Sequence, residues 1–380
     1  MLVLLLLAFI VLAGRAVYLQ GLNNDFLRQK GEARYSRVVE LSANRGMVAD
    51  RHGEPLAIST PVESLWISPE DVEATPQQLR ELAKLLNLST AAVSEKLKSQ
   101  ERNFVFLKRQ ISPELAARVM NLKIPGLFQQ REYRRYYPAG EVMAHLVGFT
   151  GVDNVGQEGL ELAYQNWLTG KPGSRRVIKD RLGHIIEDAG SIRAPQEGRD
   201  LTLSIDAKLQ YLAYRELKAA VEANKAKGGA LVVIDAVNGE VLALVNQPDF
   251  NPNNRGKLTG AQTRNRTLTD TFEPGSTLKP FTVALALESG KYRPQTLVGT
   301  AAGQLTIGRA TIRDAHANGD LTVAQIIQKS SNVGAAKIAL DMPAEKMWKM
   351  FDSVGFGAQP KTGFPGEALG KLRPYKSWKP

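Results

Sequence analysis

The start of the chain is a continuous hydrophobic run. Residues 1–13 are all apolar and include four consecutive leucines, and residues 14–19 extend the run with one arginine and one tyrosine. A full membrane span needs about 20 residues, no basic stretch precedes the run, and no Ala-x-Ala cleavage site closes it as in a secretory signal. A buried core helix is the alternative, but a helix without a polar face favours lipid. We therefore predict a membrane anchor over residues 1–20, with its cytoplasmic start before the printed sequence and the rest of the chain outside the cytoplasm.

The following 180 residues alternate between short strand patterns and helix patterns. Residues 45–57 predict two strands around a turn, which Gly53 can close with a positive φ. Helical spacing predicts helices over 76–86 and 90–98, capped by Thr75 and Ser89. These patterns indicate a small α+β region. His145, which follows the polar segment 134–140, is interpreted as a packed or hydrogen-bonded structural residue rather than a ligand.

A second unit begins near residue 200. Residues 201–205 alternate like a strand, Asp206 can cap a helix, and apolar residues then recur at helical spacing. Two apolar segments, 229–234 and 240–245, flank an Asn-Gly pair that is typical of a hairpin. Because apolar residues fill nearly every position of both segments, we expect helices to cover both faces of this sheet.

Candidate chemistry follows these strands. Ser276 and Lys279 form the single Ser-x-x-Lys of the chain, at the start of an apolar helix that stops at Gly290. Positions three apart share a helix face, so Lys279 can reach the Ser276 hydroxyl. A lysine in a dry, apolar pocket loses part of its proton affinity and can activate a hydroxyl as a base, and the free N–H groups of the first turn favour an oxyanion. An ordinary helix start with a surface lysine is the alternative.

A second polar cluster contains Ser330 and Asn332. It lies between two amphipathic segments, 322–328 and 333–340, which predict a helical hairpin with the cluster at its tip. There a hydroxyl could relay protons and an amide could hold a substrate carbonyl. Ser-x-Asn also occurs at residues 42–44, so the informative feature is the order: strand pair, Ser-x-x-Lys helix, then Ser-x-Asn.

Composition removes several other classes of function. The 380 residues contain no cysteine, which excludes disulfides, a thiol nucleophile and cysteine-ligated metals. The four histidines are scattered without metal-ligand spacing, so we do not expect a metalloenzyme. The net charge of +11 comes from basic residues spread along the chain, which disfavours nucleic acid as a partner.

The motifs resemble those of the penicillin-recognising active-serine enzymes. Ser276-Thr277-Leu278-Lys279 is similar to their first motif and Ser330-Ser331-Asn332 to their second. Upstream segments narrow the resemblance to class B penicillin-binding proteins, and most closely to the division-specific peptidoglycan D,D-transpeptidases; these segments are residues 45–57, 134–140, 148–149, 156–160, 168–173 and 265–266.

The resemblance covers nearly the whole chain and implies an α/β (α+β) multidomain fold. It implies a transmembrane anchor over residues 1–20 and a non-catalytic α+β pedestal, the dimerisation domain, over 21–200. Residues 201–380 would form the N-terminal part of a transpeptidase domain, whose central antiparallel sheet is covered by helices.

The third motif of the family, Lys-Thr-Gly, is where the chain departs from the pattern. Lys361-Thr362-Gly363 has this composition, but Pro360 precedes it and Phe364-Pro365-Gly366-Glu367 follows, and prolines interrupt strand pairing. We interpret the segment as a loop similar to the family's Thr-Gly-x-x-Pro-Gly-Glu. We therefore expect the chain to be a C-terminally truncated part of a longer protein, lacking the true motif and inactive as such.

The resemblance implies acyl transfer in peptidoglycan synthesis. Ser276 would be the nucleophile, Lys279 its base, Ser330 a proton relay and Asn332 a substrate-binding residue. The reaction would cross-link stem peptides during septal wall synthesis without a metal or organic cofactor, and β-lactams would bind covalently as inhibitors. Implied partners are stem peptides and division proteins, including a membrane glycan polymerase. The implied location is the bacterial inner membrane at the septum, with a single span and a periplasmic bulk.

Two alternatives come from other classes of function. A non-catalytic β-lactam sensor would keep Ser-x-x-Lys but would be expected to carry a cytoplasmic signalling region that this sequence does not show. A division scaffold would make the serine dispensable. A secreted β-lactamase fits the anchor and pedestal poorly, and a bifunctional synthase would need a glycosyltransferase domain for which there is neither motif nor room.

Overall fold

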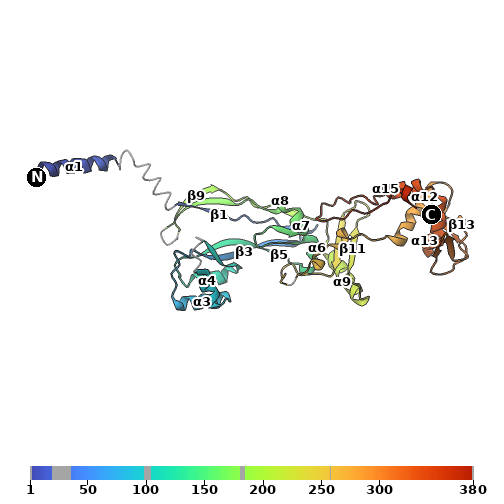
Figure 1. Ribbon diagram of the computed structural model, residues 1–380, viewed down its shortest axis with the longest axis horizontal. Helices are drawn as coiled ribbons and strands as arrows, with labels where there is room; N and C mark the ends of the chain where they lie inside the picture. The colour runs from blue at the N-terminus through green and yellow to red at the C-terminus, as the bar shows by residue number, and fades with distance from the viewer. Residues whose placement is uncertain (1, 19–35, 98–103, 180–184, 257, 379–380) are drawn as a thin grey trace. The chain divides into compact units, whose positions relative to one another are not determined.

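The computed structural model of the protein describes residues 2–18, 36–97, 104–179, 185–256 and 258–378. It divides into two compact units, residues 1–263 and residues 264–380. Figure 1 labels many of the helices and strands of each unit.

The apolar start of the chain forms helix α1 (Leu2–Val17). Its side chains at Leu7, Phe9, Ile10, Val11 and Leu12 are each more than half exposed. Among the described residues, no helix is both long and apolar enough to cross a membrane. The anchor over residues 1–20 stays a prediction.

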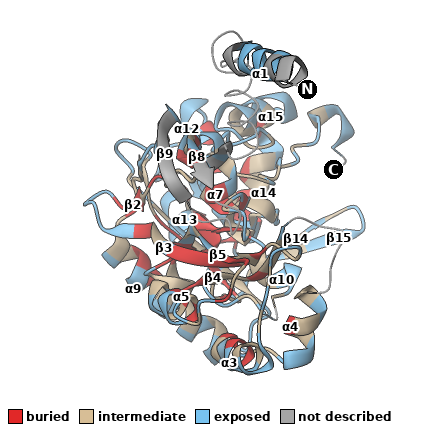
Figure 2. Ribbon diagram, turned by 90° about the vertical axis from the view of Figure 1, so that its left-hand side faces the viewer, coloured by how far each residue is buried: buried red, intermediate tan, exposed pale blue. Residues whose placement is uncertain are grey.

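A five-stranded sheet organises the next part of the first unit. Its long central strand β3 (Pro55–Ile67) pairs antiparallel with β2 (Val48–Ala49), β4 (Val105–Ile111) and β5 (Leu127–Tyr136), and β10 (Leu201–Thr202) runs parallel to β2. Three helices share one core cluster with β3, namely α3 (Pro76–Leu86), α4 (Thr90–Leu97) and α5 (Pro113–Met120). In that cluster Leu65 and Ile67 are fully buried, and most of β3 is coloured as buried in Figure 2.

Local signals in this region predicted the elements correctly. The helix predicted over 76–86 has those bounds, and Thr75 forms a capping box with Gln78. The Ser89 hydroxyl accepts a hydrogen bond from the Ala92 N–H at 3.1 Å, as expected for the cap of α4. Gly53 has a φ of +87° and closes the turn between β2 and β3. These features confirm the α+β character of the region.

A second, antiparallel sheet has the strand order β1 (Ser36–Leu41), β8 (Gly173–Lys179), β9 (Ile185–Arg193). Short elements lie between β5 and β8: η2 (Gly140–Val142), α6 (Ala144–Val147), β6 (Phe149–Thr150), β7 (Gly156–Glu158), α7 (Gly159–Ala163) and α8 (Gln165–Leu168). His145 of α6 is buried, and its Nε2 lies 2.7 Å from the Gln262 carbonyl oxygen. The prediction that it is a hydrogen-bonded structural residue is confirmed.

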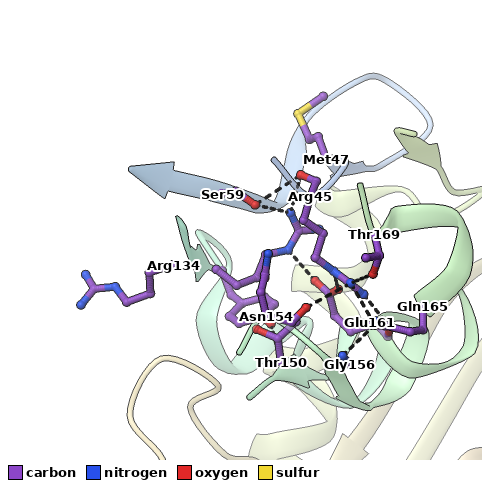
Figure 3. A network of polar contacts seen from close by, with 12 residues as sticks. Arg45, Met47, Ser59, Arg134, Thr150, Asn154, Gly156, Glu161, Gln165 and Thr169 are labelled. Carbon is purple, nitrogen blue, oxygen red and sulfur yellow. Dashed lines mark hydrogen bonds and ion pairs between the residues drawn. The ribbon is translucent and has the colours of Figure 1, made fainter. Parts of the chain in front are cut away.

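Buried charges join segments that are far apart in the sequence (Figure 3). Glu161 of α7 has no exposed side-chain surface and accepts hydrogen bonds from Arg45 Nε and Arg135 Nε, both at 2.6 Å. Arg45 also donates to Gln165 Oε1 at 2.9 Å and to Thr169 Oγ1 at 2.7 Å. Removing one partner from such a pair leaves an uncompensated buried charge. The network therefore fixes three of the upstream segments against one another.

The last part of the first unit is a helix on a two-stranded sheet. Helix α9 (Ala207–Ala223), capped by Asp206, packs against the antiparallel pair β11 (Gly229–Ile234) and β12 (Val241–Gln247). The short helix α10 (Gly260–Thr263) ends the unit. Among the described residues, α9 contacts Leu231 and Val233 of β11, whereas Val232 and Ile234 are exposed. The expected cover is therefore present on one face of β11 only.

In the second unit four helices build one core. They are α12 (Lys279–Glu288), α13 (Val323–Lys329), α14 (Asn332–Asp341) and α15 (Ala344–Ser353), whose fully buried residues include Ala286, Ile326 and Ile338. The remaining elements are α11 (Arg266–Thr269), η3 (Gly275–Leu278), η4 (Tyr375–Ser377) and the strand pairs β13 (Leu297–Val298) with β16 (Leu321–Thr322) and β14 (Gln304–Ile307) with β15 (Ala310–Arg313). A Cβ on Gly334 would lie 2.5 Å from Ile326 Cγ1. This glycine therefore allows α13 and α14 to approach closely.

Candidate active site

Ser276 and Lys279 lie at the start of α12. Ser276 is on the 3₁₀ turn η3 and Lys279 is the first residue of the α-helix, so the predicted helix begins with a tighter turn. Gly275 has a φ of +57°, a conformation that glycine adopts without strain. Ser276 is exposed and Lys279 is half-buried. The turn therefore leaves Ser276 open to solvent, whereas Lys279 is partly covered.

Ser330 and Asn332 lie at the junction of α13 and α14. Thr322 caps α13 in a capping box with Gln325, and the helix ends at Ser330 in the left-handed conformation, with a φ of +54°. Ser331 then caps α14 and accepts a hydrogen bond from the Gly334 N–H at 2.9 Å. The predicted helical hairpin is confirmed, with Ser330 and Asn332 on either side of the capping serine.

The structure brings these four side chains together. The Ser330 hydroxyl lies 3.1 Å from the Ser276 hydroxyl. Lys279 Nζ donates to Ser330 Oγ at 3.0 Å, to the Ser330 carbonyl oxygen at 2.5 Å and to Asn332 Oδ1 at 2.7 Å. In the described part of the chain, Lys279 Nζ makes no direct hydrogen bond to Ser276. The continuous path from Ser276 to Lys279 therefore runs through Ser330.

Two opposing effects act on the pKa of Lys279. Burial lowers the pKa of the Lys279 ammonium below its ordinary value, and the negative charge of Asp314 opposes that shift. A lysine with a lowered pKa is neutral in a larger fraction of molecules at a given pH. The site can therefore supply an amine that accepts a proton.

Sequence reasoning missed Asp314, which follows β15. Its Oδ2 accepts a hydrogen bond from the Ser331 hydroxyl at 2.7 Å, and its Oδ1 accepts from the Asn332 N–H at 2.5 Å. No motif marks this residue. Its partners lie 17 to 19 positions further along the chain, so no local signal in the sequence identifies it.

Lys361-Thr362-Gly363 lies in a loop. Residues 359–364 contain no helix or strand, and Lys361 has a φ of +60°. The Thr362 N–H donates to Glu367 Oε1 at 3.1 Å, which folds the segment back on its own Pro-Gly-Glu. The loop interpretation is confirmed.

Within the described part of the chain, no group of three or more histidine, aspartate or glutamate side chains could hold a metal ion. The chemistry that the four side chains offer is proton transfer and nucleophilic attack.

Comparison with protein families gives two matches in sequential order. Residues 40–203 match the penicillin-binding protein dimerisation domain, and residues 229–379 match the penicillin binding protein transpeptidase domain. Ser276, Lys279, Ser330 and Asn332 all fall within the second match.

Curated relatives align along nearly the whole chain. It is 41% identical over 376 residues to a probable peptidoglycan D,D-transpeptidase PenA of Neisseria gonorrhoeae, and 42% identical over 380 residues to the peptidoglycan D,D-transpeptidase FtsI of Escherichia coli K12. Each alignment covers 98% of this chain and 64% of the relative. The chain thus spans just under two thirds of the length of these relatives.

A solved structure agrees with this relationship. The crystal structure of a peptidoglycan synthetase from Bifidobacterium adolescentis superposes with a TM-score of 0.66 at 25% identity, covering 90% of this chain and 68% of that one. Two matched domains in this order, with relatives above 40% identity over 98% of the sequence, place the chain in one family. It belongs to the penicillin-binding proteins that carry a dimerisation domain followed by a transpeptidase domain.

Proposed function

We propose that the protein is a serine-type peptidoglycan D,D-transpeptidase that cross-links stem peptides during septal wall synthesis. The observation that carries this proposal is the path from Ser276 Oγ through Ser330 Oγ to Lys279 Nζ, with steps of 3.1 and 3.0 Å. It lies inside the segment that matches the transpeptidase family. The names of the relatives agree with the same reaction.

The reaction begins with activation of Ser276. A hydroxyl can both donate and accept a proton, so Ser330 passes the Ser276 proton to neutral Lys279. Ser276 Oγ then bonds to the carbonyl carbon of the penultimate D-alanine, and the amide bond to the terminal D-alanine breaks. The proton returns through Ser330 to the leaving amine. Asn332, whose side chain is exposed beside Lys279, orients the donor peptide.

The second step consumes the ester. An acceptor amine on a neighbouring strand attacks the acyl carbon, and its proton moves through Ser330 to Lys279. The ester bond then breaks as Lys279 returns this proton through Ser330 to Ser276 Oγ, which leaves as a hydroxyl. β-Lactams acylate Ser276 in place of the donor peptide and remain attached. The residues need no metal or organic cofactor for these steps.

The same proposal assigns the parts of the chain. Residues 1–20 anchor the protein in the bacterial inner membrane, residues 21–200 form a periplasmic pedestal, and residues 201–380 form the N-terminal part of the transpeptidase domain. The partners are stem peptides as substrate and division proteins, including a membrane glycan polymerase, at the septum.

The test is covalent labelling of the full-length protein with a fluorescent penicillin. Ser276→Ala should abolish labelling with little effect on thermal stability, because an exposed hydroxyl contributes little to packing. Ser289→Ala, which alters the hydroxyl at the other end of α12, is the matched control and should label normally. Mass spectrometry of the wild type should place the adduct on Ser276. Labelling that persists in Ser276→Ala would refute the assignment.

A transfer assay separates the enzyme from a sensor. A transpeptidase should move a stem-peptide acyl group to an added amine, whereas a sensor would be acylated by penicillin without such transfer. Labelling without transfer would reject the proposed reaction and favour the sensor.

A further inference from the structure

Asp314 holds the start of α14 from outside that helix. Its Oδ1 accepts hydrogen bonds from the N–H groups of Asn332 at 2.5 Å and Val333 at 2.9 Å, and its Oδ2 accepts from the Ser331 hydroxyl at 2.7 Å. The first N–H groups of a helix have no partner within the helix, and a negative charge there is stabilising. The carboxylate therefore fixes the backbone on which Asn332 lies.

The strand that precedes Asp314 fixes the Asn332 side chain as well. Asn332 Nδ2 donates to the Arg313 carbonyl oxygen at 2.8 Å, which turns Oδ1 toward Lys279 Nζ at 2.7 Å. Asp314 is itself held in place, because its N–H donates to the Gly303 carbonyl oxygen at 3.0 Å. The end of β15 thus determines both the position and the orientation of the amide.

Ser331 extends this support to the rest of the junction. Its hydroxyl donates to Asp314 and accepts from the Gly334 N–H at 2.9 Å. Ser331 is 1% exposed, and it separates Ser330 from Asn332. A buried serine held from both sides keeps its two neighbours in place, and both neighbours bond to Lys279.

We propose that Asp314 is the positioning residue of this site, which locks residues 330–332 so that Ser330 and Asn332 meet Lys279. Its kinetic consequence rests on the proposed function, whereas its effect on geometry does not. Asp314 is separate from the proton path, because in the described part of the chain its side chain bonds to Ser331, Asn332 and Val333, whereas the path runs through Ser276, Ser330 and Lys279.

Three variants of the full-length protein separate geometry from charge. Asp314→Ala removes the acceptors and the charge, whereas Asp314→Asn keeps one acceptor oxygen for the two backbone N–H groups and removes the charge. Asp320→Asn is the matched control, since Asp320 Oδ1 accepts from the N–H groups of Thr300 at 2.9 Å and Ala301 at 3.0 Å in the same unit.

The first measurement is amide hydrogen exchange, which requires no activity. In Asp314→Ala, exchange of the amides at residues 332–334 should accelerate on the order of 10- to 100-fold, as expected for lost hydrogen bonds to a charged group. Asp314→Asn should show a smaller change and Asp320→Asn none at these residues. Unchanged exchange in Asp314→Ala would overturn the positioning role.

The second measurement is the rate of penicillin acylation as a function of pH. Asp314→Ala should be acylated on the order of 10- to 100-fold more slowly. Among the described residues, Lys279 bonds to the uncharged side chains of Ser330 and Asn332, and the negative charge of Asp314 acts to raise its pKa. Removing that charge in Asp314→Asn lets Lys279 lose its proton more easily, so the rising acid limb should move to lower pH. Asp320→Asn should leave the profile unchanged.

The outcomes distinguish this inference from the proposed function. A wild-type protein that does not react at Ser276 would refute the proposed function, while amide exchange would still decide the role of Asp314. Normal acylation of the wild type together with equal rates in Asp314→Ala and Asp320→Asn would overturn the inference alone.

Discussion

Ser330 stands between the two side chains that the Ser-x-x-Lys spacing brings to one helix face. Lys279 bonds to Ser330 and Asn332. It therefore accepts the Ser276 proton through the Ser330 hydroxyl rather than by direct contact with Ser276. Both serines are exposed, so a substrate can reach the nucleophile and the relay from the same side. Lys279 contributes an amine whose pKa is lowered by burial.

Replacing this lysine tests its role as the base. Because the pKa of Lys279 is lowered, the wild-type acylation rate should rise with pH below the ordinary titration range of lysine and then level off. Lys279→Arg keeps the charge but cannot supply a neutral side chain. Acylation should fall about 10²- to 10⁴-fold, the usual contribution of a general base, and should not recover at alkaline pH.

The control for this variant is Lys291→Arg, because Lys291 bonds to Asp341 outside the site. It should retain the wild-type rate and pH profile. Near-normal acylation of Lys279→Arg would exclude Lys279 as the base.

The sequence could predict the site residues whose relation is local and could not predict those held by distant contacts. Ser276 and Lys279 are three positions apart, so helix geometry places them on one face, although the hydrogen bonds that connect them run through Ser330. Asp314 reaches Ser331 across 17 residues, and the pairing of β14 with β15 brings it there. No short-range pattern encodes that pairing.

Among the helices and strands, too, local features can be predicted from the sequence and contacts between distant residues cannot. The bounds of α3 can be predicted because helical spacing and the Thr75 cap lie within the segment itself. The meeting of Arg45 and Arg135 on Glu161 joins residues 116 and 26 positions apart, and periodicity carries no information about such contacts. The open face of β11 was missed for a related reason, since apolar residues alone do not say whether a neighbour covers them.

Two matching capping boxes, one in each unit, allow a test of how the helices support the site. Thr322 caps α13 and Thr75 caps α3, each with glutamine three positions later. Either threonine-to-alanine change should cost about 1 kcal/mol of local stability. Only Thr322→Ala should also slow penicillin acylation, because α13 ends at Ser330 whereas α3 belongs to the other unit.

Amide hydrogen exchange in the two helices checks the stability effect, and penicillin labelling checks the activity. Local exchange is the suitable measure because a protein of two units need not unfold in one step. Equal slowing of acylation in both variants would show that the effect is general destabilisation rather than support of the site.

At the scale of the whole molecule, the proposed reaction requires the first 20 residues to hold the protein at the membrane. Peptidoglycan stem peptides lie outside the cytoplasm, so the chain must be exported and kept near the membrane where the wall is built. The start of the chain fits this demand because α1 exposes a row of large apolar side chains between Leu7 and Leu12. We therefore expect the full-length protein to stay in the membrane pellet after alkaline carbonate extraction.

Charged substitutions in α1 test whether its apolar surface is responsible. Arginine near the centre of a spanning helix costs about 2.5 to 3.5 kcal/mol on insertion scales, so the double variant Leu7→Arg with Ile10→Arg should shift the protein toward the soluble fraction. Leu212→Arg, at an exposed leucine of α9, adds the same charge elsewhere and should remain in the pellet. Extraction of the unaltered protein into the soluble fraction would exclude the anchor. Release of the Leu212→Arg control together with the double variant would show that α1 is not what holds the protein at the membrane.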